Sequence, residues 1–268
     1  MNIVVCIKQV PDTTNVRINP ETNTLIREGV ESIINPFDMY AIEEALRVKE
    51  KVGGKVIIMS MGPPQVEDAL RTALSLGADE AILLSDRAFA GADTLATSYT
   101  LAQGLRKIKD VGLVFMGKQA IDGDTGQVGP GVAEHLKMPH ITDIRKIEEI
   151  SEKEIVCERL LEEGYVRLKG KLPVILTVVK EINEPRLPSL RGKMAAKKAE
   201  ITVWNYEALG ISDERIGLNG SPTQVMKIFT PPKPGGGKMF EGEPADTVKQ
   251  LLSELRTGGI QLGSARGE

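Results

Sequence analysis

The sequence predicts an α/β fold with a doubly wound, mostly parallel sheet, an antiparallel extension and a C-terminal arm. In the first half of the chain, four short apolar runs alternate with amphipathic stretches of helical period. The runs are apolar at nearly every position, which is typical of strands that helices cover on both faces. From about Glu154 the pattern changes to closely spaced apolar runs with glycine-containing turns between them, which favours antiparallel strands.

Four strands and the helices between them form the predicted parallel sheet. The strands are Ile3–Ile7, Lys55–Met59, Ala81–Leu84 and Gly112–Met116. Proline and glycine mark the first and last turns of several helices, and right-handed crossovers between the strands follow from this alternation. The expected helices are Asn35–Gly53, Pro63–Gly77, Asp93–Lys109 and Gly126–Lys137. A short hairpin is predicted between the first strand and the first helix, with arms Val16–Ile18 and Thr24–Ile26.

The second half of the chain is predicted to extend the sheet and then to leave it. The expected antiparallel strands are Ile155–Cys157, Tyr165–Leu168 and Pro173–Val179. Residues 183–193 should be irregular because prolines and a glycine interrupt them, and residues 230–238 are typical of a linker. A last helix, Pro244–Arg256, is amphipathic and follows the linker, so it needs an apolar partner surface, which another chain could supply. Its apolar face consists of Val248, Leu251, Leu252 and Leu255.

The composition excludes several classes of protein. Among 268 residues, 34 Lys and Arg oppose 37 Asp and Glu, so the chain lacks the basic surplus of a nonspecific nucleic-acid binder. No apolar run reaches the roughly 18 residues of a membrane helix, and no leader peptide is visible, so a soluble cytoplasmic protein is expected. Two distant cysteines and two histidines favour neither a disulfide framework nor a metal site. His135 and His140 are expected at helix ends or on the surface.

A glycine-rich loop after the fourth strand is the main candidate site. Five glycines fall within the fifteen residues 117–131, and Thr125 is a candidate N-cap for the helix that follows. If the first four strands have the order 3-2-1-4, this loop and the loop after the first strand border one crevice. Free N–H groups at the start of the helix would bind a phosphate or pyrophosphate there. A flexible loop before an ordinarily capped helix is the alternative, but the position after a central strand favours nucleotide binding.

A second group of polar residues follows the third strand. Thr94 and Thr97 stand on one face of a helix that begins near Asp93. Spacing alone favours Asp93 as the N-cap, with both threonines facing solvent. No G-x-G-x-x-G follows the first strand, no phosphate-binding P-loop is present, and no acid–base constellation stands out. The sequence therefore indicates a protein that holds a ligand with its backbone rather than one with a reactive side chain.

Three ordered motifs carry a resemblance to a known family. They are Asn35-Pro36-Phe37-Asp38, Gly117-Lys118-Gln119-Ala120-Ile121-Asp122 with its glycine-rich continuation, and Asn183-Glu184-Pro185-Arg186 with the downstream Lys197-Lys198. Together they resemble the β subunit of an electron-transfer flavoprotein, and the resemblance spans nearly the whole chain. The stretches 122–130 and 92–97 resemble the electron-bifurcating type, because simple members differ at both.

The resemblance implies an adenine-nucleotide-hydrolase-like fold and a heterodimer with a larger α subunit that carries an FAD. In simple members the β subunit binds AMP, whereas in bifurcating members a second FAD takes that place and accepts hydride from NADH. One electron then goes through the α-subunit FAD to an acyl-CoA dehydrogenase-like flavin dehydrogenase, and the other goes to ferredoxin or flavodoxin. Such a subunit is an electron carrier, and NADH is oxidised only within the αβ complex.

The resemblance also implies the binding residues. Cys6 and Met61 should border the adenine side, residues 35–38 should contact the adenosine, residues 122–130 should wrap the pyrophosphate, and Thr94 with Thr97 should reach the flavin. This last assignment reverses the expectation from spacing. The implied cofactor-binding residues are Cys6, Lys8, Asn35, Phe37, Asp38, Met61, Asp93, Thr94, Thr97, Gly117, Gln119, Asp122, Gly123, Asp124, Thr125, Gly126, Gln127, Val128, Gly129 and Pro130. The implied partner-recognition residues are Glu184, Pro185, Arg186 and, as the apolar anchor, Leu190.

The resemblance implies two domains, and three other functions remain as alternatives. Residues 1–222 would form the FAD-binding domain, and residues 223–268 would form a linker and a helix that docks on the α subunit. A non-bifurcating β subunit with structural AMP is the nearest alternative. A nucleotide-sensing module of the universal-stress-protein kind is disfavoured because it needs neither a recognition loop nor a C-terminal arm. An adenine-nucleotide hydrolase is disfavoured because the chain lacks a P-loop.

Overall fold

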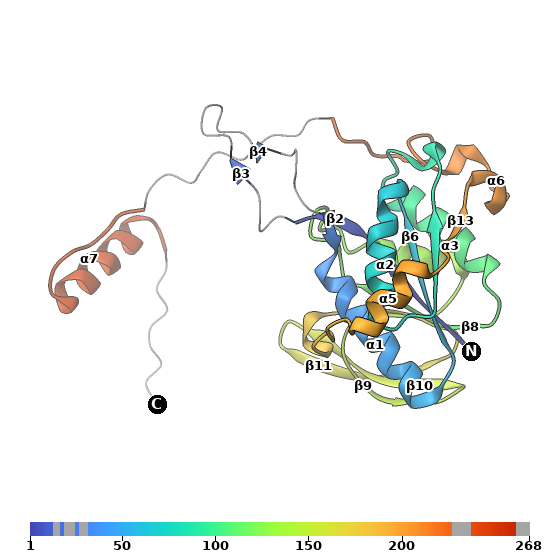
Figure 1. Cartoon of the computed structure of the whole chain (residues 1–268). Coiled ribbons are helices and arrows are strands. Elements are labelled where there is room, and N and C mark those ends of the chain that lie inside the picture. Colours follow the sequence, from blue (N-terminus) through green and yellow to red (C-terminus); the bar gives the residue numbers. More distant parts are fainter. Residues whose placement is uncertain (13–16, 19–24, 27–31, 227–236, 261–268) are drawn as a thin grey trace. The chain divides into compact units, whose positions relative to one another are not determined.

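A nine-stranded mixed sheet is the framework of the structure, a computed structural model that describes residues 1–12, 17–18, 25–26, 32–226 and 237–260. The chain forms two compact units, Met1–Met226 and Lys227–Glu268, and the sheet belongs to the first. In order across the sheet, the strands are β11 (Gly164–Lys171), β10 (Glu154–Leu161), β9 (His140–Ile150), β12 (Val174–Val178), β8 (Val111–Gly117), β1 (Asn2–Ile7), β6 (Lys55–Met61), β7 (Glu80–Leu84) and β13 (Thr202–Trp204) (Figure 1).

The first four strands of the parallel sheet have the order predicted from the sequence. Strand β1 pairs in parallel with β6 on one side and with β8 on the other, and β7 follows β6. Strand order therefore reverses between β1 and β8, and their carboxyl ends border a crevice of the kind in which such sheets bind ligands. Two short antiparallel pairs lie outside the sheet: β2 (Gln9–Pro11) with β5 (Ser32–Ile34), and β3 (Arg17–Ile18) with β4 (Leu25–Ile26). The second pair confirms the predicted hairpin, whose turn lies outside the described residues.

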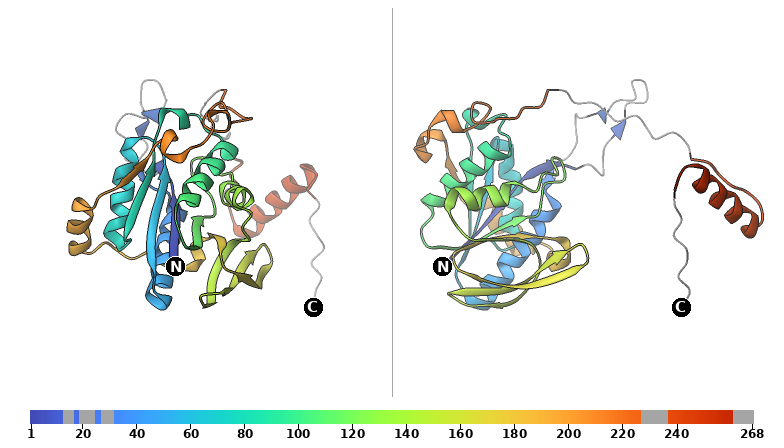
Figure 2. Two further views of the ribbon diagram at one scale, coloured as in Figure 1. Left: turned by 90° about the vertical axis from the view of Figure 1, so that its right-hand side faces the viewer. Right: turned by 180° about the vertical axis from the view of Figure 1, so that it is seen from behind.

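Helices cover both faces of the sheet. The helices of the first unit are α1 (Pro36–Val52), α2 (Glu67–Leu76), α3 (Thr94–Lys107), α4 (Val128–Leu136), α5 (Leu190–Lys198) and α6 (Tyr206–Leu209). Short 3-10 turns lie at η2 (Pro64–Val66), η3 (Arg87–Phe89), η4 (Lys180–Ile182) and η5 (Asp213–Arg215). Helices α1, α2 and α5 lie on one face of the sheet, and α3, α4 and α6 lie on the other (Figures 1 and 2). Their buried side chains contribute to two separate cores. Successive residues of β1 alternate between these two cores, which explains its continuous apolar sequence.

The extension of the sheet differs from the sequence prediction at two strands. Strands β9, β10 and β11 form an antiparallel meander, but β12 runs parallel to both β8 and β9. All five residues of β12 are buried, as expected for a central strand covered on both faces, so the prediction of an antiparallel strand at 173–179 was wrong. Strand β9 was not predicted at all. Its isoleucines at 141, 144 and 147 are three residues apart, and this spacing hides the two-residue period of a strand. The pairing of β9 accommodates the spacing by register irregularities.

Residues 183–198 are more regular than their sequence indicates. Residues 183–189 lack regular structure as predicted, but α5 begins at Leu190 and continues through Gly192. A Cβ atom at Gly192 would lie 2.2 Å from the carbonyl oxygen of Ser75, so glycine is required where α5 crosses the end of α2. The glycine that argued against a helix is therefore what lets this helix pack.

The second unit contains helix α7 (Pro244–Thr257), which confirms the predicted last helix. Its apolar residues Val248, Leu251 and Leu252 are exposed within the structure. Most of the predicted linker, residues 230–236, lies outside the described residues. Within the described ranges, no helix is both long enough and apolar enough to cross a bilayer.

Candidate functional site

The first turn of α1 organises the crevice between β1 and β8. The turn follows β5, and the main-chain N–H of Asn35 donates to the carbonyl oxygen of Lys8 at 2.8 Å. Pro36 occupies the first helical position, where its fixed φ favours the helix and its missing N–H costs nothing. Two buried side chains of this turn, Asn35 and Asp38, then reach across to the loops that follow β1 and β8. The predicted motif at 35–38 therefore lies at the crevice.

Asn35 holds the loop after β8 in place. Its side chain is 1% exposed, its Nδ2 donates to the carbonyl oxygen of Gln119 at 2.8 Å, and its Oδ1 accepts from the N–H of Ile121 at 3.1 Å. A buried amide that satisfies one main-chain acceptor and one main-chain donor fixes the loop path. The side chain is therefore a structural clamp, because both of its polar atoms have main-chain partners in the loop.

Asp38 ties the two loops to each other. Its Oδ2 accepts from the N–H of Lys8 at 2.7 Å, and its Oδ1 accepts from the N–H of Gly117 at 3.1 Å. Burial raises the pKa of this carboxyl to about 7, although both main-chain donors and the Lys8 ammonium favour the charged form. A Cβ atom at Gly117 would lie 2.4 Å from Oδ1 and 2.7 Å from the Cβ of Phe37. Glycine at 117 thus permits the close approach of β8 to α1.

Charged side chains of the two loops pair across the crevice. The Lys8 ammonium contacts both carboxylate oxygens of Asp122 at 2.7 Å. The side chain of Gln119 donates to Asp124 within the glycine-rich loop. Asp122 and Asp124 therefore act on neighbouring loop residues, as expected for acids that hold a turn.

The start of α4 lies two residues later than predicted, and the predicted N-cap at Thr125 was wrong. Helix α4 begins at Val128, and Gln127 occupies the cap position without a side-chain cap bond. Asp124 and Gly126 have φ values of 55° and 63°, and this left-handed backbone prevents the helix from starting earlier. The N–H groups of the first helical turn have no intrahelical acceptors, and Val128 donates to no group in the described part of the chain.

The glycines of this loop have two different roles. A Cβ atom at Gly129 would lie 2.5 Å from the Thr177 side chain, and one at Gly131 would lie 2.7 Å from the Ser98 hydroxyl. These two glycines let α4, with Pro130 in its first turn, pack against β12 and α3. A Cβ atom at Gly123 would meet nothing within 4 Å, and one at Gly126 would meet only the Lys118 carbonyl oxygen at 3.7 Å. Residues 123–126 therefore present main chain to open space.

The residues before α3 combine capping with a contact to α4. Asp93 caps α3 as predicted from spacing, and its Oδ1 accepts from the N–H groups of Leu95 and Ala96. Its Oδ2 accepts from the N–H and the hydroxyl of Thr223 at 3.0 and 2.8 Å. Burial opposes ionisation of Asp93, but these hydrogen bonds outweigh it and keep its pKa below the usual value. The sequence contains no signal that would have identified Thr223 as its partner.

Thr94 links the two helix starts that border the crevice. Its hydroxyl donates to the side-chain oxygen of Gln127 at 3.0 Å, so the first turns of α3 and α4 meet there. Thr97 lies one turn further along α3 and is half-buried, as is Thr94. Both threonines thus keep part of their surface in solvent, as spacing alone favoured, and Thr94 also contacts α4.

Cys6 and Met61 lie in adjacent strands near the same edge. Burial, with a smaller effect of the Asp38 charge, raises the pKa of the Cys6 thiol to about 12, so this thiol stays neutral. Met61 ends β6 and is half-buried. Between them, the Ser60 hydroxyl donates to the Ile7 carbonyl oxygen at 2.8 Å and ties β6 to β1, a role that no sequence motif indicated.

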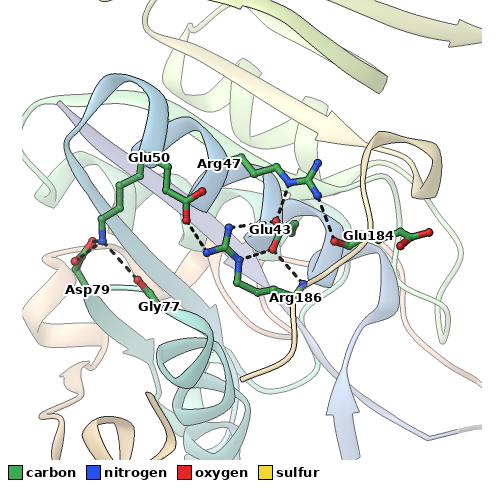
Figure 3. Close-up of polar contacts among 8 residues, drawn as sticks. Glu43, Arg47, Glu50, Gly77, Asp79, Glu184 and Arg186 are labelled. Carbon is green, nitrogen blue, oxygen red and sulfur yellow. Dashed lines mark hydrogen bonds and ion pairs between the residues drawn. The ribbon is translucent and has the colours of Figure 1, made fainter. Parts of the chain in front are cut away.

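The predicted partner-recognition residues Glu184 and Arg186 contact α1. The guanidinium of Arg186 binds the carboxylates of Glu43 and Glu50 on α1, and the carbonyl oxygen of Glu184 accepts from Arg47 at 3.4 Å (Figure 3). Leu190 is 78% exposed. The sequence analysis missed Glu43, although its spacing of four residues from Arg47 indicates a helical ion pair.

A groove and the two histidines complete the set of candidate features. A groove of about 490 Å³ lies between α1 and α2 and is bordered by Ile33, Pro36, Met39, Thr72 and Pro185. Among the described residues, no three side chains of metal-binding type come together. His135 packs edge-on against Tyr99 near the end of α4, and His140 is exposed at the start of β9, as predicted for both.

Comparison with known proteins gives a consistent result. The family model described as "Electron transfer flavoprotein domain" matches residues 22–209. The chain is 53% identical to "Caffeyl-CoA reductase-Etf complex subunit CarD" of Acetobacterium woodii, over 96% of this chain and 98% of that protein. It is 52% identical to "Electron transfer flavoprotein subunit beta" of Thermoanaerobacterium thermosaccharolyticum, over the same shares. It is 49% identical to "Protein FixA" of Azotobacter vinelandii, over 96% of this chain and 95% of that protein.

Proposed function

The chain belongs to the electron transfer flavoprotein family, and we propose that it is the β subunit of an electron-bifurcating member, paired with an α subunit. The observation that carries this proposal is the crevice at which strand order reverses, whose two loops are clamped by Asn35 and Asp38. The 53% identity to a subunit of a caffeyl-CoA reductase-Etf complex supports a role within such a complex, and the bifurcating type rests on the resemblance of residues 92–97 and 122–130.

The residues at the crevice fit a nucleotide with a diphosphate. The first turn of α4 offers unpaired N–H groups, and the loop at 123–126 is open on the side where main chain could approach a ligand. The loop after β1 contributes a cation, the Lys8 ammonium, which pairs with Asp122. We assign the diphosphate to the first turn of α4 and to Lys8, and the adenosine to the edge formed by Cys6, residues 35–38 and Met61.

The roles of the chain's own residues follow from this assignment. A bound FAD supplies redox chemistry in steps of one or two electrons, so the chain needs to bind, orient and exclude water rather than react. Asn35 and Asp38 fix the loops, Gly117 permits their approach, and the neutral Cys6 thiol adds no competing nucleophile. Thr94 and Thr97 would contact the flavin end from the start of α3, where Thr94 already meets Gln127.

The proposed electron donor is NADH, and the proposed acceptors are ferredoxin or flavodoxin and an acyl-CoA dehydrogenase-like flavin dehydrogenase. We assign the cofactor to residues 1–222, dehydrogenase recognition to Glu184, Pro185, Arg186 and Leu190, and docking on the α subunit to residues 223–268. Helix α7 supports the last assignment, because its exposed Val248, Leu251 and Leu252 leave an apolar face that a helix of this length needs to bury.

A cofactor count on the co-expressed αβ complex tests the function. The bifurcating β subunit predicts two FAD per heterodimer, measured by absorbance and by mass spectrometry of the released nucleotides. One FAD and one AMP per heterodimer would instead make this chain the β subunit of a simple carrier. Absence of any nucleotide beyond the α-subunit FAD would contradict both versions.

A matched pair of glycine variants tests the assigned position. Gly126→Val should deplete the second nucleotide, because a β-branched residue is strained at the φ of 63° found there. Gly210→Val, at a φ of 64° and outside this loop, with nothing within 4 Å of an added Cβ atom, is the control and should keep full occupancy. Equal occupancy in the two variants would remove the loop from the site.

A further inference from the structure

The recognition segment, defined here as residues 183–190, is fixed to α1 by a group of charged side chains. The Nε of Arg186 donates to Glu43 at 2.7 Å, its Nη2 donates to the other Glu43 oxygen at 3.2 Å, and its Nη1 donates to Glu50 at 2.6 Å. The main-chain N–H of Arg186 also donates to Glu43 at 3.2 Å. Figure 3 shows the guanidinium between the two carboxylates. One arginine therefore holds both the side chain and the backbone of the segment against the helix.

Glu43 is the centre of this group. Its side chain is 4% exposed, whereas the Glu50 side chain is 58% exposed. Besides the three bonds from Arg186, its carboxylate accepts from the Nε of Arg47 at 2.7 Å. Burial opposes ionisation of Glu43, but the hydrogen bonds from Arg186 and Arg47 prevail and keep its pKa below the usual value. A buried carboxylate with this many donors gives the Arg186 side chain a single geometry.

Further contacts fix the segment at both ends. At its start, the side-chain amide of Asn183 donates to the carbonyl oxygen of Tyr40 and to Glu44, both at 3.0 Å. At its end, the Ser189 hydroxyl caps α5 by accepting from the N–H of Gly192 at 2.9 Å. Beyond the segment, the Arg71 guanidinium donates to the Ala196 carbonyl oxygen at 2.6 Å and ties α5 to α2. The chain between these points has little freedom to move.

Two leucines stand out from this rigid frame. Leu187 is 89% exposed and Leu190 is 78% exposed, and they lie one and four residues after Arg186. Large apolar side chains held in water by a fixed backbone are typical of contact residues, because a fixed backbone has less conformational entropy to lose on binding.

We propose that Glu43 is a positioning residue: by binding Arg186 it preforms the recognition segment, so that Leu187 and Leu190 together contact the partner dehydrogenase. This inference rests on the proposed function and adds Leu187 and Glu43 to it. Because the segment is ordered before binding, loss of Glu43 weakens association with the partner and leaves the cofactor site, which α1 serves from its first turn, intact.

The test compares Glu43→Gln with Glu50→Gln in the full-length chain co-expressed with its α subunit. Both variants make the same chemical change to a carboxylate that binds Arg186, but one carboxylate is buried and the other exposed. The first readout is hydrogen exchange of peptides that cover residues 183–192. The second is electron transfer to a purified acyl-CoA dehydrogenase, titrated to separate KM for the αβ complex from kcat.

Glu43→Gln should raise KM roughly fivefold to tenfold, as expected when a few side chains must be ordered on binding, with kcat changed less than about twofold. Exchange in residues 183–192 should become roughly tenfold faster, and the flavin content should not change. Glu50→Gln should change each quantity less than about twofold. Arg186→Lys, which keeps the charge but loses the fork, should resemble Glu43→Gln in direction.

Unchanged exchange and unchanged KM in Glu43→Gln would overturn the proposal. A parallel fall in flavin content and kcat would also overturn it, since Glu43 would then act on the fold or the cofactor site. If the wild-type complex transfers no electrons to the dehydrogenase, the proposed function is at fault. The exchange comparison still decides in that case whether Glu43 holds the segment, and faster exchange in Glu43→Gln alone supports it.

Discussion

Two parts of helix α1 hold two different loops, and they do so by different interactions. In its first turn, Asn35 and Asp38 are buried and bind main-chain groups of the loops after β1 and β8. Further along the helix, Glu43 and Glu50 bind the guanidinium of Arg186 in the recognition segment. The crevice is thus built from hydrogen bonds to the backbone, and the recognition segment is held by ion pairs to one buried carboxylate, Glu43, and one exposed carboxylate, Glu50.

This difference separates the residues that stabilise the fold from those that we propose to recognise a partner. Buried groups that lose a hydrogen-bond partner cost the full desolvation of the group left behind, so the crevice cannot change without loss of stability. The ion pair of Arg186 with the exposed Glu50, by contrast, contributes little to folding and is screened by salt. Substitutions at the crevice should therefore lower both stability and nucleotide content, and substitutions on the outer side of the recognition segment should lower neither.

Asp38 should give the largest effect, seen as a dependence of stability on pH. Burial raises its pKa from 3.8 to about 7 in the folded state, so between these values the folded chain keeps a proton that the unfolded chain releases. Stability should then fall as pH rises from about 4 to 7 and level off above that range, by on the order of 4 kcal/mol at most. Denaturant unfolding of the wild type and of Asp38→Asn across this range measures it. The variant should lack this part of the slope, and equal slopes would show that Asp38 does not titrate in this window.

Asn35→Ala should give the next largest effect. The substitution leaves the Gln119 carbonyl oxygen and the Ile121 N–H without their buried partner, which should cost about 2–4 kcal/mol and deplete the crevice of nucleotide. Asn205→Ala is the control, because Asn205 is exposed and caps only the short helix α6, so about 1 kcal/mol is expected there. A loss at Asn35 no larger than that at Asn205 would contradict the clamp.

Gly117→Ala should have a somewhat smaller effect. The added methyl group would collide with Asp38 and with the main chain of Phe37 at 2.8 Å, and the resulting shift of β8 from α1 should cost about 1–3 kcal/mol. Gly123→Ala adds the same methyl group in open space and should stay within about 0.5 kcal/mol of the wild type. Thermal unfolding of the two variants side by side measures the difference, and similar midpoints would mean that β8 tolerates a side chain at 117.

The parallel half of the fold could be predicted because each signal there is local. The order of β7, β6, β1 and β8 follows from buried apolar strands that alternate with capped helices. Strand β9 could not be predicted in the same way, since Ile141, Ile144 and Ile147 are three residues apart and fit a strand only with the register irregularities of its pairing. Helix α5 was missed because Gly192 is needed for contact with Ser75, which lies far away in the sequence.

The candidate site shows the same division between local and tertiary signals. The motif at 35–38 and the glycine-rich loop lie at one crevice, as their positions after strands indicated. Two of the five glycines, Gly129 and Gly131, instead pack against Thr177 and Ser98, and composition alone could not distinguish the two roles. The link between Asp93 and Thr223 is also tertiary, so no spacing rule could have found it.

Leu190→Ala should have the smallest effect on the fold, and it tests most directly whether the crevice and the recognition segment are independent. The side chain is exposed at the first position of α5, so stability should change by less than about 0.5 kcal/mol, and flavin content should stay at the wild-type level. Electron transfer to the dehydrogenase should nevertheless weaken, because a central apolar contact contributes about 1–2 kcal/mol or more to binding. Parallel measurement of unfolding, flavin absorbance and KM for the complex separates these quantities. Loss of flavin in Leu190→Ala would mean that the recognition segment and the cofactor crevice are coupled through α1, and the two parts of this helix would then have to be treated as one site.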